Sequence, residues 1–173
     1  FVLGYKGYIQ LALRSGYYEQ LNVVEIKEGE VIETDDINEV YKFKRIKDDK
    51  ERASKPTVGY YAYFRYNAAH GGFFKAMYWA KDIMLQYADT YAPAFNLEAV
   101  KSNNPKKSRV SYADFLAHKY PPEDAWKYSS FWYVNFDSME KKTMIRQPIG
   151  KWGTMSVDFQ KAHEAEGSFK DEL

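Results

Sequence analysis

The sequence predicts an α+β fold in which an antiparallel β-sheet is flanked by helices. Three observations predict it. Residues 59–66 alternate like a half-buried strand, residues 73–79 follow a turn and form its expected antiparallel partner, and residues 80–91 change to a helical period. Strands followed by a helix in this order give an α+β layer. The 173 residues include no cysteine and can bury a core without disulfide or metal staples.

The first helix is expected within residues 1–16 and has two different faces. On a period of 3.6 residues one side is apolar, while Lys6, Gln10 and Arg14 recur one turn apart on the opposite side. The apolar side consists of Tyr5, Tyr8, Ile9, Ala12 and Leu13. Gly16 stands where a left-handed C-cap favours glycine, so the helix is expected to end there. One face suits a hydrophobic core and the other suits an anion.

Short strands and turns are expected next along the chain. Residues 21–27 resemble a strand with β-branched bulk, residues 28–30 a turn, and residues 31–32 the beginning of a return. Around residues 41–43 aromatic and lysine side chains alternate, as in a half-buried strand. Residues 47–55 are expected to form a polar loop of mixed charge.

The clearest strand is residues 59–66, with one face expected to carry Tyr60, Ala62, Phe64 and Tyr66. Residues 67–72 should turn the chain, so that residues 73–79 pair back antiparallel. A helix is expected over residues 80–91. Its apolar stripe consists of Ile83, Met84, Tyr87, Ala88 and Tyr91.

Residues 93–110 are predicted to form a long basic loop, because they are rich in Asn, Ser, Lys and Pro. Loops of this length are often functional or disordered. The stretch 103–109 could be an arm that contacts nucleic acid, and a solvated insertion fits its composition equally well. Ser111 and Asp114 then form a capping box for a short helix that ends near Lys119.

The distribution of charge matters more than its sum. A net charge of +1 argues against a nucleic-acid binder, because neutralising a phosphate backbone requires clustered Lys and Arg. Residues 28–39, however, hold six acids and no base, whereas residues 101–109 and 141–151 each hold four bases and no acid. Such a segregated surface could steer a polyanion into one groove.

Aromatic residues form 18% of the chain, enough for both a core and a stacking surface. Tyrosine is the most frequent, and a buried tyrosine needs a partner for its hydroxyl group, so many rings are expected to be half exposed. Base stacking would contribute ~1–3 kcal/mol per base. Ordinary packing in a sheet explains the same composition and is favoured for any single ring.

Residues 4–16 read Gly-Tyr-Lys-Gly-Tyr-Ile-Gln-Leu-Ala-Leu-Arg-Ser-Gly. This run resembles the GYKG-x-IQLA-x-RSG motif of the RecT family of phage and prophage single-strand DNA annealing proteins, which act as recombinases. Its thirteen consecutive positions are far more specific than a lone glycine pattern. The resemblance extends over most of the chain. It implies the strand-strand-strand-helix core that single-strand annealing proteins share, including the eukaryotic annealing protein of break repair.

A second motif, residues 132–146, resembles the W-x-x-x-F-x-x-M-x-x-KT-x-x-R helix of the same family. Lys142 and Arg146 lie one turn apart, where two cations repel unless an anion such as phosphate binds between them. Alternatively, they are solvated bases that complement a helix C-terminus. The resemblance favours phosphate. Because residues 147–150 include Pro148 and Gly150, we do not expect the helix to continue beyond Arg146.

The resemblance implies ATP-independent binding of single-stranded DNA and annealing of complementary strands in phage-type homologous recombination, by a ring- or filament-forming oligomer without a catalytic site. Lysines and arginines are expected to hold phosphates, and tyrosines to stack on bases or line the groove. The expected DNA-binding residues are Tyr5, Lys6, Tyr8, Arg14, Tyr17, Lys106, Lys107, Arg109, Lys141, Lys142, Thr143, Arg146 and Lys151.

Two other classes of function stay open. The acids of residues 28–39 could suggest a metal-dependent nuclease, but a solvated edge is favoured there because a nuclease needs carboxylates that converge on an ordered site. The three histidines are isolated, so no metal site is expected. A phage structural or protein-binding module is the other alternative. No Gly-Lys-Ser/Thr phosphate loop occurs, so no ATP motor is expected.

The expected partners are single-stranded DNA, the annealed duplex and further copies of the chain, with a cognate phage exonuclease and the host single-strand-binding protein as further candidates. No cofactor is expected, although magnesium could assist annealing. The longest apolar runs are shorter than the ~18 residues that span a bilayer, so neither a membrane nor secretion is expected, and the location is the bacterial cytoplasm. Since Phe1 already lies beside the first motif, residues 1–173 are expected to be the single annealing core domain of a protein extending beyond both ends.

Overall fold

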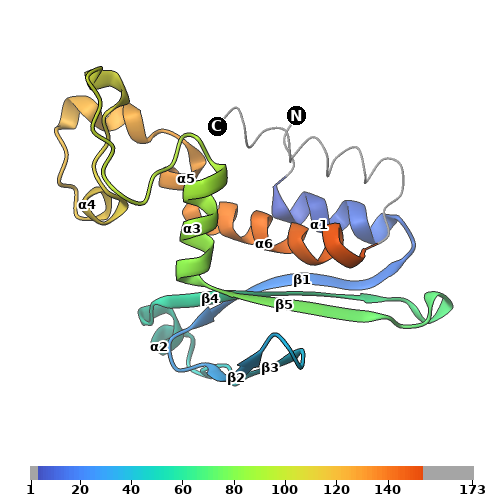
Figure 1. Ribbon diagram of the computed structural model, residues 1–173. Coiled ribbons are helices and arrows are strands. Elements are labelled where there is room, and N and C mark those ends of the chain that lie inside the picture. The colour runs from blue at the N-terminus through green and yellow to red at the C-terminus, as the bar shows by residue number, and fades with distance from the viewer. Residues whose placement is uncertain (1–3, 154–173) are drawn as a thin grey trace.

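The computed structural model describes residues 4–153, and its centre is a three-stranded antiparallel sheet (Figure 1). The strands β1 (Tyr18–Lys27), β4 (Thr57–Tyr66) and β5 (Phe74–Ala80) lie in the order β1-β4-β5. The turn that joins β4 to β5 includes the short 3₁₀ helix Ala68–His70. The predicted α+β class and the predicted pairing of β4 with β5 are confirmed.

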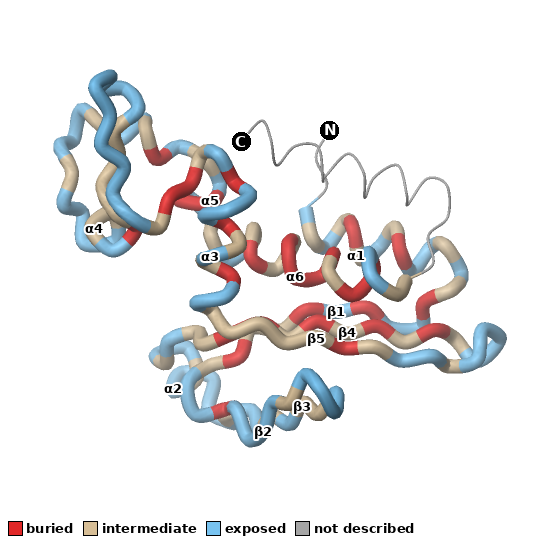
Figure 2. The backbone as a smooth tube through the Cα atoms, in the orientation of Figure 1, coloured by how far each residue is buried: buried red, intermediate tan, exposed pale blue. Residues whose placement is uncertain are grey.

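Two helices from the opposite ends of the chain cover one face of this sheet. Helix α1 (Tyr5–Arg14) lies beside α6 (Phe136–Trp152), and both run across the same side in Figure 1. The first helix ends as predicted, since Gly16 takes a positive φ of 81°. Figure 2 shows the buried segments concentrated where α6 and α1 meet the strands. The two sequence motifs are therefore neighbours in space.

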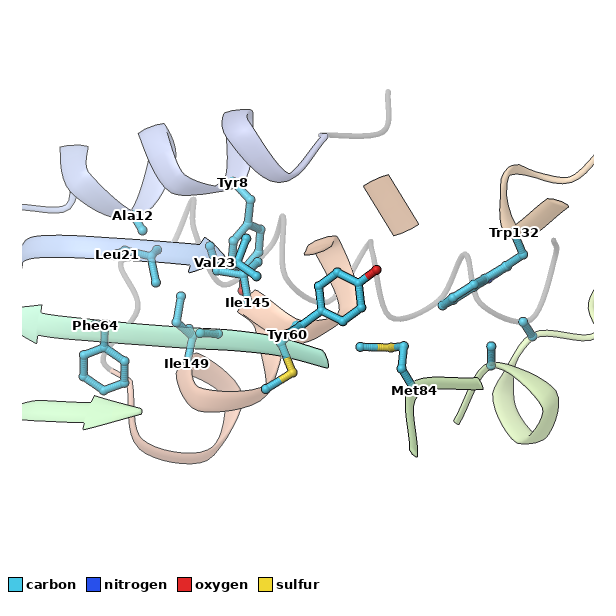
Figure 3. Packing of buried hydrophobic residues seen from close by; sticks show 14 of the residues in the cluster. Tyr8, Ala12, Leu21, Val23, Tyr60, Phe64, Met84, Trp132, Ile145 and Ile149 are labelled. Carbon is cyan, nitrogen blue, oxygen red and sulfur yellow. The ribbon is translucent and has the colours of Figure 1, made fainter. Parts of the chain in front are cut away.

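The main core fills the layer between these helices and the sheet. The predicted alternation of β4 is confirmed: Tyr60, Ala62, Phe64 and Tyr66 are all buried. In Figure 3 the side chains of Tyr60 and Phe64 lie in the same layer as those from the helices and from β1. The helix and β1 side chains labelled there are Tyr8, Ala12, Leu21, Val23, Ile145 and Ile149. The sheet and both motif helices thus share one hydrophobic cluster.

The opposite face of the sheet carries a separate hairpin of β2 (Val31–Asp35) and β3 (Val40–Phe43). The strand expected to begin at residue 31 is β2, and it pairs with β3. It does not pair with β1, whose partner is β4. Phe43 packs against Tyr61 and Tyr78, with ring centroids 5.1 and 5.5 Å apart. These contacts hold the hairpin against the outer side of β4 and β5.

The prediction of a polar loop over residues 47–55 is wrong, because helix α2 (Asp49–Ser54) forms there. Asp48 caps it by accepting a hydrogen bond from the Glu51 amide at 2.8 Å. Arg52 of this helix reaches the buried carboxylate of Glu30, Nε to Oε2 2.9 Å. A local cap and one long-range ion pair together order a segment that lacks apolar periodicity.

Helix α3 (Lys81–Tyr91) follows β5 as predicted, but its apolar stripe is narrower than expected. Met84 and Ala88 are buried, whereas Ile83 and Tyr91 are exposed. The reason is visible in Figure 1, where α3 stands at one end of the sheet and is covered on only part of its circumference.

Residues 93–134 form a lobe beyond α3 that is built largely from loops (Figures 1 and 2). It contains α4 (Tyr112–Leu116), α5 (Phe131–Val134) and the 3₁₀ segments Pro105–Lys107 and Pro122–Tyr128. The predicted cap of α4 is confirmed, since the Ser111 hydroxyl accepts a hydrogen bond from the Asp114 amide at 3.1 Å.

Buried Asn96 fixes the long loop to this lobe. Its side-chain amide donates to the Val110 carbonyl at 3.1 Å, and its Oδ1 accepts from the Tyr133 hydroxyl at 3.1 Å. Arg109 also donates to Asn96 Oδ1, at 3.3 Å, and an antiparallel bridge joins Val100 to Arg109. The side chain of Asn96, near the beginning of segment 93–110, therefore forms hydrogen bonds with Arg109 and Val110 at its end, which fixes the path of the segment.

Helix α6 corrects a second expectation. It begins after a break at Asn135 and continues through Pro148 to Trp152 instead of ending at Arg146. A proline inside a helix costs about 3 kcal/mol. Burial of Pro148 and Ile149 against the core offsets this cost, and the Gln147 side chain donates to the Thr143 carbonyl at 3.0 Å. No helix within residues 4–153 is long and apolar enough to cross a membrane.

Candidate nucleic-acid interface

A pocket of about 520 Å³ opens where the beginning of α1 meets α5 and the first half of α6. We call it the helix pocket. Its lining consists of Gly4, Tyr5, Lys6, Phe131, Asn135, Ser138, Met139 and Lys142. Both sequence motifs contribute to it, because residues 4–16 supply the first three of these residues and residues 132–146 supply the last four.

Helical geometry explains why these positions share one wall. Ser138 and Met139 lie four and three residues before Lys142, which places the three on the same side of α6, and Asn135 immediately precedes the helix. Tyr5 lies in the first turn of α1, whose buried side is fixed against the core by Tyr8 and by Ala12. Core packing therefore sets the distance between the two walls.

The chemistry of the helix pocket suits an anion that carries a flat ring. Lys6 and Lys142 supply two ammonium groups, and Asn135 and Ser138 add polar groups that can form hydrogen bonds. None of the described residues that line it is an acid. Phe131 is 58% exposed, which is unusual for a phenylalanine and gives the pocket an apolar ring at its edge.

Lys141 holds the two walls together instead of facing the pocket. Its ammonium group lies 3.1 Å from the Asp137 carboxylate and 5.5 Å from the centre of the Tyr5 ring. Burial lowers the pKa of Lys141, but the hydrogen bond and the charge of Asp137, with that of Glu25, outweigh burial and hold the pKa above its usual value. This lysine is thus a permanent cation, and its nearest anion is already in place.

The structure separates the predicted pair Lys142 and Arg146. Lys142 lines the helix pocket, but Arg146 is only 9% exposed and lies among the buried residues of α6. Lys6 lines the same pocket as Lys142. The two cations that share a pocket are therefore Lys6 and Lys142, and Arg146 is not among its lining residues. Thr143, also expected at the interface, is buried.

The remaining predicted residues of α1 and its neighbourhood lie elsewhere. Tyr8 is 1% exposed and belongs to the core. Arg14 is exposed at the opposite end of α1 from Lys6, about 12 Å away at 1.5 Å per residue. Tyr17 packs on His70 in the β4–β5 turn, with ring centroids 4.3 Å apart. Arg14 therefore lies on the surface, whereas the rings of Tyr8 and Tyr17 pack against other residues.

Lys151 lies in acidic surroundings. It is exposed near the end of α6, and its amine lies 4.7 Å from the Trp152 ring centre. A shallow pocket of about 280 Å³ there is also lined by Asp36 and Glu39 of the hairpin. These carboxylates make this end of α6 a poorer phosphate site than the helix pocket.

Two bases of the long loop reach a second pocket, of about 370 Å³, which we call the loop pocket. Its lining consists of Ala94, Lys106, Arg109, Trp126, Lys127, Ser129 and Ser130. Lys107 is exposed beside Lys106 but does not line it. The predicted basic loop is therefore part of a shaped site that includes residues from outside the loop.

The acids of residues 28–39 mostly have structural partners. Glu30 pairs with Arg52, and Asp35 accepts hydrogen bonds from the amides of Ile37 and Asn38 at 2.9 and 3.1 Å. Glu39 pairs with Lys75 at 2.8 Å. Within residues 4–153, no three His, Cys, Asp or Glu side chains come together as a possible metal site.

Sequence reasoning missed three important residues: Phe131, Trp126 and Glu140. Phe131 and Trp126 are large rings with more than half of their surface exposed. Their sequence neighbours gave no signal, because Tyr128, Trp132 and Tyr133 of the same segment are buried in the core. Glu140 gave no signal, because a charged residue on an amphipathic helix is normally solvated.

The chain is similar to known proteins over nearly its whole length. A family model described as RecT family matches residues 1–172. A curated relative from Bacillus subtilis (strain 168), the uncharacterized protein YqaK, is 33% identical over 162 residues. The matched region covers 94% of this chain and 43% of YqaK, so the chain spans less than half the length of that relative.

Proposed function

The chain belongs to the RecT family, and from that premise we propose that it binds single-stranded DNA by its backbone and anneals complementary strands in homologous recombination. The observation that carries this proposal is the helix pocket. Lys6 and Lys142 come from two motifs far apart in the sequence, and they line one pocket without a described acid between them. Two cations placed this way are stabilised by a shared phosphate.

The pocket binds a strand without reading its sequence. Contacts to phosphate carry no sequence information, so binding is sequence-neutral and strongly dependent on salt. The exposed ring of Phe131 and the Tyr5 ring offer apolar surfaces for a sugar or a base. A strand that is held by its phosphates keeps its Watson–Crick edges open, and a complementary strand can then pair with it.

The other parts of the proposed function concern the whole protein. In this proposal annealing needs neither ATP nor a catalytic site, and residues 1–173 hold no Gly-Lys-Ser/Thr phosphate loop that could serve a motor. Several copies hold one strand, as a ring or a helical filament. A phage exonuclease supplies the strand and the host single-strand-binding protein covers it, in the bacterial cytoplasm. No resident cofactor is required, and magnesium assists annealing.

The test is annealing of complementary oligonucleotides, together with equilibrium binding of one strand, across a salt series. The variant Lys6→Ala/Lys142→Ala should bind more weakly, and its slope of log K against log salt should be shallower by about 1.4, at about 0.7 for each lost phosphate contact on a single strand. Annealing should slow at every salt concentration at which the unmodified chain is not saturated.

The matched control is Lys44→Ala/Lys47→Ala, which removes the same charge from exposed positions beside β3 and α2. It should leave the salt slope unchanged. Equal slopes for the pocket variant and the unmodified chain would show that Lys6 and Lys142 do not hold phosphate. Cleavage of labelled single strands in the presence of magnesium would instead support a nuclease.

A further inference from the structure

The loop pocket has the composition of a nucleotide site. Lys106 and Arg109 come from the long loop, and Lys127 comes from the 3₁₀ segment before α5. Lys127 already pairs with Asp124, Nζ to Oδ2 3.0 Å, so the excess positive charge lies at the two loop residues. Arg109 is oriented by its hydrogen bond to Asn96, which is buried. One of the two cations is thus pre-positioned.

Trp126 gives this pocket a flat ring beside its cations. The indole is 56% exposed, and the Lys127 amine lies 6.0 Å from its centre. Tryptophan is seldom left so exposed unless its ring is used, because burying an aromatic ring is strongly favourable. An exposed indole next to ammonium and guanidinium groups matches the stacking platforms that hold single-stranded nucleic acid.

A hydroxyl group without a partner lies in the wall of this pocket. The Ser130 Oγ is buried and has no hydrogen-bond partner among the residues that the structure describes. Ser130 lines the loop pocket together with Ser129. A buried hydroxyl without a partner carries a desolvation cost, and a phosphate or sugar oxygen in the pocket would remove it only if the side chain turned towards the ligand.

The loop pocket and the helix pocket meet at one short segment. Ser129 and Ser130 line the first, and the next residue, Phe131, lines the second. Consecutive Cα atoms are about 3.8 Å apart, so the two pockets are lined by adjacent residues of the chain, with none between them. The exposed ring of Phe131 stands at that boundary.

We propose that the loop pocket binds a nucleotide of the same single strand that the helix pocket holds, with its base on Trp126 and its phosphate between Lys106 and Arg109. The strand crosses from one pocket to the other over Phe131. This inference rests on the proposed function and extends it to a second site.

Equilibrium binding of oligothymidylates of increasing length tests the proposal. For strands long enough to reach both pockets, Trp126→Ala should weaken binding roughly tenfold or more, the ratio expected for one stacked base. Trp126→Phe should retain most of the affinity. The shortest strands, which fill the helix pocket alone, should bind Trp126→Ala and the unmodified chain equally well.

A strand with a single abasic position gives a sharper readout. If Trp126 stacks on one base, then removing that base and removing the indole should cost no more together than either change alone. Leu116→Ala is the matched control, because Leu116 is a similarly exposed apolar residue of the same lobe, at 59%, outside both pockets. It should leave affinity unchanged at every length.

The outcomes distinguish this inference from the function on which it rests. If Trp126→Ala binds long strands normally while Lys6→Ala/Lys142→Ala binds weakly, the proposed nucleotide site in the loop pocket is wrong and the proposed function stands. A change in self-association of Trp126→Ala without a change in DNA affinity would also contradict this site. Absence of salt-dependent binding in the unmodified chain would instead contradict the proposed function.

Discussion

Two glutamates are buried on opposite sides of the sheet, and they differ in their hydrogen-bond partners and in the direction in which their pKa is shifted. On the hairpin side, the Glu30 carboxylate accepts hydrogen bonds from Arg52 and from the amides of Lys27 and Ile46. Burial raises the pKa of Glu30, but these hydrogen bonds outweigh it and hold the pKa below its usual value. This carboxylate is therefore ionised at neutral pH.

On the helix side, the carboxyl group of Glu140 is completely buried and has no hydrogen-bond partner within residues 4–153. Burial, with a smaller effect from the charge of Glu25, raises the pKa of Glu140 to about 9. The group is therefore neutral at pH 7. The comparison teaches that the hairpin side is organised by polar pairing, whereas the helix side is an apolar layer that tolerates a carboxyl group only without its charge.

The same contrast explains how a chain of net charge +1 can present a basic site. The acids of the hairpin are largely engaged with partners, as Glu33 is with Lys42 of the hairpin and Glu39 is with Lys75 of β5. On the helix side the core fixes α1 and α6, and Lys6 and Lys142 line one pocket without a described acid. The basic site is therefore local, since Lys151 at the end of α6 lies beside Asp36 and Glu39.

The largest expected effect is on the apolar layer itself. Ile145→Ala should lower the free energy of unfolding by about 4 kcal/mol, because Ile145 is fully buried and alanine would leave a cavity. On the hairpin, Ile32 is 63% exposed, and Ile32→Ala should change stability by less than about 0.5 kcal/mol. Urea unfolding measures both. Similar losses of unfolding free energy for the two variants would contradict the difference between the helix side and the hairpin side.

A smaller loss is expected from the polar side. Glu30→Gln should cost about 3 kcal/mol at pH 7, because it leaves the Arg52 guanidinium without its buried partner. The pKa of Glu30 is lower in the folded chain than the value of 4.5 expected when unfolded, so its stabilising effect is complete above pH 4.5 and is lost as the pH falls through the folded value.

Unfolding curves recorded between pH 3 and pH 7 should therefore show a difference between Glu30→Gln and the unmodified chain that is largest near pH 7 and decreases as the pH falls below 4.5. The matched control is Glu33→Gln, whose carboxylate forms an exposed pair with Lys42 at 3.5 Å and should contribute under about 1 kcal/mol. A constant difference across this range would mean that the charge of Glu30 is not what stabilises the hairpin side.

The smallest of the three effects has the opposite sign. Glu140→Gln should raise stability by about 2 kcal/mol at pH 7, since glutamine keeps the shape of the neutral acid and cannot ionise. The pKa of Glu140 is raised in the folded chain, so the unmodified chain loses stability as the pH rises from 4.5 towards 9. The gain should therefore grow between pH 5 and pH 8.

Thermal unfolding across that range measures the gain, and Glu19→Gln, at an exposed position of β1, is the control that should show none. A loss of stability in Glu140→Gln at pH 8 would indicate that Glu140 is ionised and paired in the folded chain, and the contrast with Glu30 would disappear.

The sequence alone determined the elements whose pattern is local. The alternation of Tyr60, Ala62 and Phe64 predicts β4 because successive side chains of a strand face opposite sides. The spacing of Tyr8 and Ala12, with Gly16 after them, predicts α1 and its end. These signals need only the repeat of the backbone and the polarity of each side chain.

Only the tertiary structure decided where the helix of the second motif ends and which charges meet. Helix α6 passes through Pro148 because burial of that residue and of Ile149 outweighs a lost backbone hydrogen bond, and burial depends on the sheet beneath it. Likewise, Lys142 shares a pocket with Lys6, whereas Arg146 is buried. Such contacts join positions far apart in the chain, so their energies exist only once the sheet has brought both helices together.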